Sequence, residues 1–179
     1  MSESDVEVIK LMSVALNYEK QLVLKTEIEA YHNATNYVIE QILKIRKKKA
    51  SEIIEAIGDE FSEKFDSRTA YLKDVVKTAR VTIGEHKQKA RWRRDLKNKV
   101  PKFKPNIMIF SAPLIEISHE AAFLTVKSGE QKAIPFDKHS RNKNKEILSE
   151  IIKDPKKMDR VRLMWNKEGY FNVDIRVFR

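Results

Sequence analysis

The spacing of the apolar residues changes near Pro101 and Pro105. From Tyr18 to Ile83 apolar side chains recur every three or four residues, which is the spacing of one face of a helix. Beyond the prolines apolar side chains recur at every second residue, which is the spacing of one face of a strand. We therefore predict the α+β class: a helical bundle inserted after a first strand, followed by a small antiparallel β-barrel or twisted sheet with one covering helix.

Three amphipathic helices are expected before the change of spacing. The first extends from Tyr18 to Arg46, and Asp66-Ser67 is a suitable N-cap for the third. The apolar stripes of the second and third helices are Ile54, Ile57, Phe61 and Phe65, and Leu72, Val75, Val76, Ala79 and Ile83. Because three such stripes can bury one another, we assign their aromatic residues to the core and none of them to a site.

Two hairpin turns are expected in the β region, at 127–130 (KSGE) and at 166–169 (NKEG), and a first strand is expected over 6–16. A short helix between the hairpins begins near Ser140 and ends at Asp154-Pro155. Antiparallel pairing of short strands follows from these turns.

The last hairpin places arginines between apolar residues, so that one face of the sheet is core and the outer face is basic. These arginines are Arg160, Arg162 and Arg176. The predicted domains are 1–16, the first strand of the β domain, 17–98, the helical insertion with a basic C-terminal end, and 99–179, the antiparallel β domain.

Nine basic residues and one acidic residue, Asp95, lie between positions 87 and 104. The segment therefore carries most of the formal net charge of +10. Trp92 and Phe103 interrupt it, although a segment that only confers solubility has no use for large rings. The basic residues are Lys87, Lys89, Arg91, Arg93, Arg94, Lys97, Lys99, Lys102 and Lys104.

Phosphate neutralisation together with base stacking explains both features, so we predict these basic residues as phosphate contacts and Trp92 and Phe103 as stacking residues. The alternative is a solvated helix end whose Trp packs into the core. The three arginines of the last hairpin are secondary candidates, for which solvated surface residues are an equally fair interpretation. A smaller basic cluster precedes acidic residues that can neutralise it, and consists of Lys44, Arg46, Lys47, Lys48 and Lys49.

Residue types that carry catalysis or bind metals are missing or scattered. The chain has no Cys, and its four histidines and four glycines form neither a metal-ligand pair nor a phosphate-binding loop. We therefore expect no catalytic residue, metal, cofactor or small-molecule substrate. No apolar stretch approaches the roughly 20 residues that cross a bilayer, so we expect a cytoplasmic protein without a membrane partner.

The order of parts, with a strand, a helical insertion, a basic connector and a β-rich half, resembles the N-terminal half of the insertion-sequence OrfB (TnpB) proteins, relatives of type V CRISPR effectors. Residues 17–21 (NYEKQ) loosely match the start of that family's first helix, without its proline. Residues 30–37 (AYHNATNY) look like its small-and-Asn-containing helix segment. Residues 100–105 (VPKFKP) look like its proline- and lysine-rich entry to the barrel, and this is the better match.

Members of that family are RNA-guided DNA endonucleases, in which a helical recognition lobe and a wedge barrel grip the guide RNA and the guide-target duplex while a later RNase H-like domain cuts. The family's first catalytic Asp and its zinc ribbon are not expected within these residues. The resemblance therefore implies a transposon-associated protein, either a piece of a longer chain or a stand-alone relative, that grips without cleavage.

Our leading prediction is a non-catalytic protein that binds guide-type RNA, an RNA-DNA duplex or both, by backbone charge and shape. The rival prediction is a helical protein-protein interaction module, in which the stripe of the first helix mates with a partner helix and the basic segment docks an acidic protein. A nuclease with unrecognised carboxylates is a third and weaker prediction.

Overall fold

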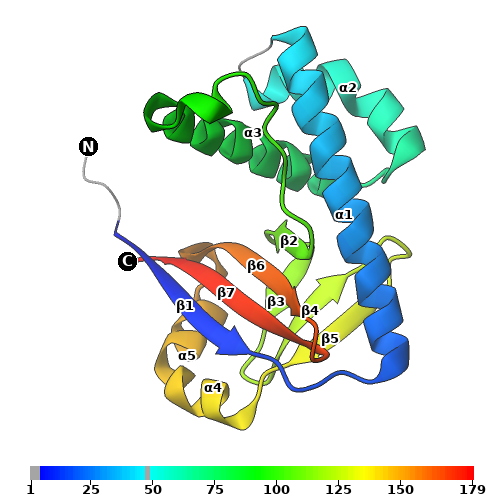
Figure 1. Cartoon of the computed structure of the whole chain (residues 1–179). Coiled ribbons are helices and arrows are strands. Elements are labelled where there is room, and N and C mark those ends of the chain that lie inside the picture. The colour runs from blue at the N-terminus through cyan, green and yellow to red at the C-terminus, as the bar shows by residue number, and fades with distance from the viewer. Residues whose placement is uncertain (1–4, 47–48) are drawn as a thin grey trace. The chain divides into compact units, whose positions relative to one another are not determined.

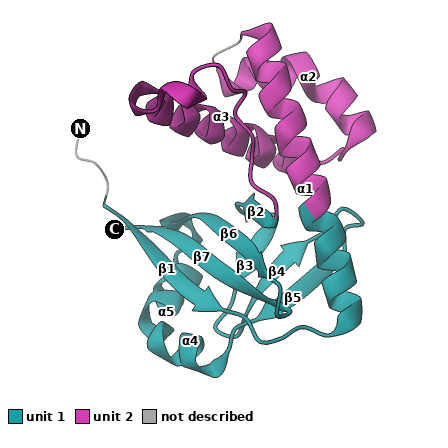
Figure 2. Ribbon diagram, in the orientation of Figure 1, with its two compact units in different colours: residues 1–28, 106–179 teal, residues 29–105 magenta. Residues whose placement is uncertain are grey.

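The computed structural model describes residues 5–46 and 49–179, and it has the predicted α+β class (Figure 1). Contacts divide the chain into two compact units (Figure 2). Unit 1 consists of residues 1–28 and 106–179, and unit 2 of residues 29–105. The unit boundaries thus fall at 28/29 and 105/106, whereas the sequence prediction divided the chain at 16/17 and 98/99.

Unit 1 contains two antiparallel sheets. The first has the order β1-β7-β6-β2 and the second the order β3-β4-β5. The strands are β1 (Val6–Met12), β2 (Ile107–Phe110), β3 (Ile115–Ile117), β4 (Ala121–Thr125), β5 (Gln131–Pro135), β6 (Met158–Asn166) and β7 (Tyr170–Phe178). The first strand of the chain pairs with the last along its whole length, from Val6 opposite Phe178 to Met12 opposite Asn172.

The two sheets are joined where β1 ends. Ser13 forms an isolated antiparallel bridge with Phe136, and the amide of Val14 donates to the carbonyl of Pro135 at 2.9 Å. The strand predicted over 6–16 is therefore shorter in the first sheet, because residues after Met12 turn toward the second sheet. Within the described residues the sheets do not close into a barrel, so of the two predicted alternatives the barrel is wrong.

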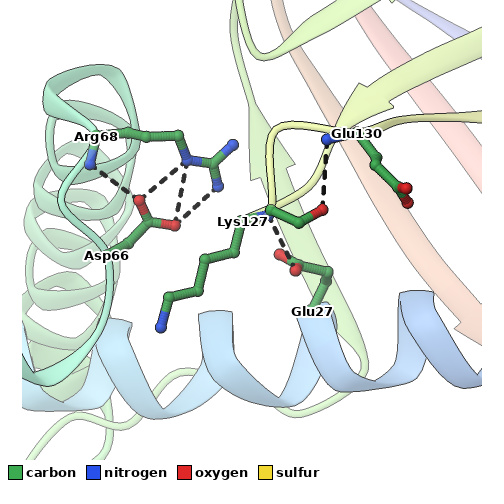
Figure 3. A network of polar contacts seen from close by, with 6 residues as sticks. Glu27, Asp66, Arg68, Lys127 and Glu130 are labelled. Atoms are coloured by element: carbon green, nitrogen blue, oxygen red, sulfur yellow. Dashed lines mark hydrogen bonds and ion pairs between the residues drawn. The ribbon is translucent and has the colours of Figure 1, made fainter.

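Both predicted hairpin turns are present. β4 and β5 flank the turn at 127–130, β6 and β7 flank the turn at 166–169, and Gly129 and Gly169 have φ of 89° and 96°. The first turn is also fixed from outside, because the amide of Lys127 donates to the carboxylate of Glu27 at 3.1 Å (Figure 3).

The predicted covering helix is interrupted at Asn144, which separates α4 (Lys138–Lys143) from α5 (Lys145–Lys153). Asp137 caps α4 by accepting from the amide of Ser140 at 2.7 Å, so Ser140 does not begin the helix. Asp154 ends α5, as predicted, and the short η2 (Pro155–Lys157) follows.

Unit 2 contains most of α1 (Tyr18–Ile45), then α2 (Ala50–Lys64), α3 (Thr69–Trp92) and η1 (Arg94–Leu96). Most residues of the predicted stripes are buried, but Phe65 is only half-buried. In α2, Ile53 and not Ile54 faces the core, because Ile53, Ile57 and Phe61 have the helical spacing of four. The unit therefore has the bundle core expected from the sequence.

The predicted N-cap of the third helix is wrong. Arg68 occupies the cap position of α3 and makes no side-chain cap bond. The Asp66 carboxylate instead accepts from the Arg68 amide at 2.9 Å and from the Arg68 guanidinium at 2.8 Å (Figure 3). Because Asp66 is 4% exposed, this charge-assisted pair satisfies a carboxylate that burial would otherwise destabilise.

Two glycine substitutions test the backbone of the two units in opposite directions. Gly84 lies inside α3, where an added Cβ meets nothing within 4 Å, so Gly84→Ala raises the free energy of unfolding by about 0.5–1 kcal/mol. Gly129 has a positive φ and equally open surroundings, so Gly129→Ala lowers it by about 1 kcal/mol. Urea unfolding followed by circular dichroism measures both, and effects of the same sign contradict the described backbone.

Candidate nucleic-acid interface

The basic segment lies entirely in unit 2, on the C-terminal turns of α3, on η1 and on residues 97–104, which form a turn at 97–98 and then continue outside any helix or strand. All nine predicted phosphate contacts are exposed. Trp92, the last residue of α3, is 90% exposed, so the alternative in which this ring packs into the core is wrong. We call the nine cations and Trp92 the basic surface.

Phe103 does not belong to this surface. Its side chain is 9% exposed, and its ring meets that of Tyr31 edge-to-face with centroids 5.7 Å apart. Its amide donates to the side-chain oxygen of Asn36 at 2.8 Å. The prediction that Phe103 stacks on a base is therefore wrong, because burial against Tyr31 leaves the ring no face to offer.

Two attachments hold the basic segment against the bundle. A ring nitrogen of His86 hydrogen-bonds the carbonyl of Leu96 at 3.1 Å, which ties η1 back to α3. Phe103 holds the other end, through its ring contact with Tyr31 and the hydrogen bond from its amide to Asn36. Residues 97–102 thus lie between two attached residues, Leu96 and Phe103, and the lysines among them are exposed. Neither attachment has a local sequence signal, and sequence reasoning did not find His86 or Asn36.

Electrostatics separates one cation of the surface from the rest. The Arg93 guanidinium donates to the Asp95 carboxylate at 2.8 Å, and this hydrogen bond holds the pKa of Asp95 below its usual value. Asp95 is therefore charged at neutral pH and forms an ion pair with Arg93. Among the residues that the structure describes, no ion pair joins any of the other eight cations to an acidic group.

A solubilising role explains only part of this charge. Cations near the C-terminus of a helix interact favourably with its dipole, which accounts for Lys89 and Arg91 at the end of α3. The lysines at 97, 99, 102 and 104 lie beyond the helix and gain nothing from it. Eight like charges that have no ion pair with a described residue repel one another, a cost that a polyanion removes on binding.

A groove opens beside the basic surface and lies within unit 2. It has a volume of about 650 Å³ and is bordered by α3 and by residues 97–101. Its lining combines apolar side chains, among them Leu43 of α1 and Ile83, with four cations of the basic surface. These cations are Lys87, Arg91, Lys97 and Lys99.

The three arginines of the last hairpin belong to unit 1 and are not equivalent. Arg160 is 5% exposed and donates to the carbonyl of Ile109 at 3.3 Å, so its prediction as an outer-face contact is wrong. The cause is a break in strand register between Met158 and Val161, which lets Arg160 and Val161 both point inward. A one-residue irregularity of this kind is invisible to an alternation argument.

The other two arginines of the hairpin are exposed but lie near acidic groups: Arg162 is 3.8 Å from Asp174, and Arg176 is 3.9 Å from Asp159. In the smaller basic cluster, Lys44 pairs with Glu40 at 3.1 Å, Arg46 and Lys49 are exposed, and Lys47 and Lys48 lie outside the described residues.

Within the described part of the chain, no three His, Cys, Asp or Glu side chains are grouped so as to hold a metal ion. No helix among the described residues is long and apolar enough to cross a membrane. Comparison of the sequence with known family models and with curated proteins gives no match to either.

Removal of the Asp95 carboxylate tests the electrostatics of the basic surface. Asp95→Asn frees Arg93 and takes away the one negative charge, so affinity for a single-stranded oligonucleotide rises two- to fivefold at low salt and the slope of log K against log[salt] steepens by about 0.7. Fluorescence anisotropy at several salt concentrations measures both. The control is Asp59→Asn on the exposed side of α2, which changes the net charge equally. Equal effects of the two variants contradict a local role.

Proposed function

We propose that the chain binds nucleic acid through the basic surface of unit 2. One observation carries the proposal: Trp92, 90% exposed, lies among eight exposed cations that have no ion-pair partner in the described part of the chain. Cations neutralise phosphates and release counterions, and an exposed indole offers a face on which a base can stack. The surface thus combines the two contacts that a nucleic-acid strand makes irrespective of its sequence.

Within this class we propose a guide-type RNA as the ligand, alone or paired with a DNA strand, and binding without cleavage. The arrangement of the chain supports a relationship to the OrfB proteins, because unit 2 is inserted after a strand that pairs with the last strand of unit 1. This is the order of parts on which the resemblance rests. The groove and the unpaired cations lie on the inserted unit, where that family has its recognition lobe.

Burial of the first helix disfavours the rival interaction module. Tyr31 and Val38 are 0% exposed, and the Tyr31 hydroxyl lies 2.6 Å from the hydroxyl of Thr78 on α3. The apolar stripe of α1 in unit 2 is thus occupied by the chain itself and offers no face to a partner helix.

Three cations outside the groove provide the test of nucleic-acid binding. In the variant Lys89→Ala, Arg94→Ala, Lys102→Ala, the slope of log K against log[salt] becomes shallower by about two units for single-stranded RNA, since each lost phosphate contact removes about 0.7. Affinity falls across unrelated sequences by similar factors, because phosphate contacts do not read bases. Anisotropy titrations from dilute to physiological salt measure the slope.

The matched control removes three exposed lysines of unit 1, in Lys138→Ala, Lys143→Ala, Lys145→Ala, and lowers the net charge by the same amount. If binding depends on the basic surface, this control keeps the wild-type slope. A control that reduces the slope as much as the test variant shows that only total charge matters, and it overturns the proposal.

A further inference from the structure

The groove of unit 2 has a mixed chemistry that phosphate contacts alone do not require. Ile83 and Pro101 form its buried part, while Val100 and Leu43, at 61% and 41% exposed, extend the apolar lining into solvent. Its volume of about 650 Å³ lies within the range of roughly 300–1,000 Å³ typical of small-ligand sites. Large exposed apolar side chains in a concave surface mark a place where something apolar binds.

The charged side chains around this apolar lining are all positive. Lys87 and Arg91 on α3 and Lys97 and Lys99 on the following segment all contribute to the groove, and the lining that the structure describes contains no Asp or Glu. The positive charge also continues past the groove to Lys102 and Lys104. The ligand therefore has an apolar part that fits between cations and an anionic part that repeats along its length.

We propose that the groove receives an unpaired base, while the cations around it neutralise the phosphates on either side of that nucleotide. This inference rests on the proposed function and narrows it, because it names the ligand of the basic surface as an unpaired segment of nucleic acid. Trp92 follows Arg91 directly and offers an exposed ring for stacking of a neighbouring base. A single strand presents a base with an apolar face and a phosphate at each nucleotide, as the groove requires.

A fully paired duplex does not satisfy the groove. Each base of a duplex is stacked on both faces, and its removal from the stack costs a few kcal/mol. A duplex therefore contacts the cations but leaves Val100 and Leu43 in water. Loops, bulges and single-stranded ends of a structured RNA present bases that are already unstacked.

Two exposed apolar residues give variants that separate the groove from the charges around it. Leu43→Ser with Val100→Ser keeps the net charge and alters only side chains that are already 41% and 61% exposed. The matched control, Leu22→Ser with Val81→Ser, changes the same residue types at 49% exposure on α1 and α3, outside the groove. Far-UV circular dichroism and the unfolding midpoint verify that each variant is folded.

Each variant of the full chain is titrated with four labelled probes of equal charge: single-stranded RNA, a fully paired RNA duplex of half that length, an abasic sugar-phosphate chain, and polyglutamate. We expect the groove variant to lose affinity for single-stranded RNA by about three- to tenfold, with an unchanged salt slope, because it removes apolar contact and no phosphate contact. Its affinities for duplex and abasic chain stay at the wild-type values, and the control variant matches wild type throughout.

Three results overturn the base-binding groove: a groove variant that binds single-stranded RNA as wild type does, an abasic chain that binds wild type as tightly as RNA, or polyglutamate that binds as tightly as either. The first two leave the salt-slope test of the basic surface intact, so the narrower inference fails alone. Tight binding of polyglutamate indicates an acidic protein partner, and together with an unchanged slope in the Lys89, Arg94 and Lys102 variant it removes the proposed function as well.

Discussion

The buried ring of Tyr31 is the contact on which the arrangement of unit 2 depends. It is 0% exposed, its hydroxyl lies 2.6 Å from that of Thr78, and its ring meets those of Tyr71 and Phe103 edge-to-face. One side chain of α1 thus holds both α3 and the extended segment that returns from it. Because Phe103 is fixed there, the lysines before it stay on the surface, and the groove between them and α3 remains open.

Repulsion among the cations of the basic surface raises the free energy of the folded protein, and binding of a polyanion would relieve this repulsion. Nine cations lie within eighteen residues, and among the residues that the structure describes, Arg93 alone of the nine forms an ion pair, with Asp95. Stability alone would favour acidic residues among these cations. On α2, for example, Lys64 forms an ion pair with Glu60 at 2.7 Å. The proposed nucleic-acid ligand would account for the lack of such pairs between this segment and the other described residues.

In unit 1 the first and the last strand of the chain lie side by side. β1 pairs with β7 over its whole length, so residues 29–105 form an insertion between two strands of one sheet. An insertion of this kind can vary in size and surface while the sheet that carries it keeps its register.

Much of the architecture follows from local pattern in the sequence. The α+β class, the three helices and the two hairpin turns were predicted correctly, because hydrophobic period and turn chemistry act over a few residues. Whether a given ring or arginine is buried depends on distant residues. Phe103 is core because Tyr31 and Asn36 meet it, and Arg160 is buried because the register of β6 breaks beside it. Composition thus determined that a cationic segment with rings exists, and only tertiary packing decided that Trp92 stays in solvent while Phe103 anchors the fold.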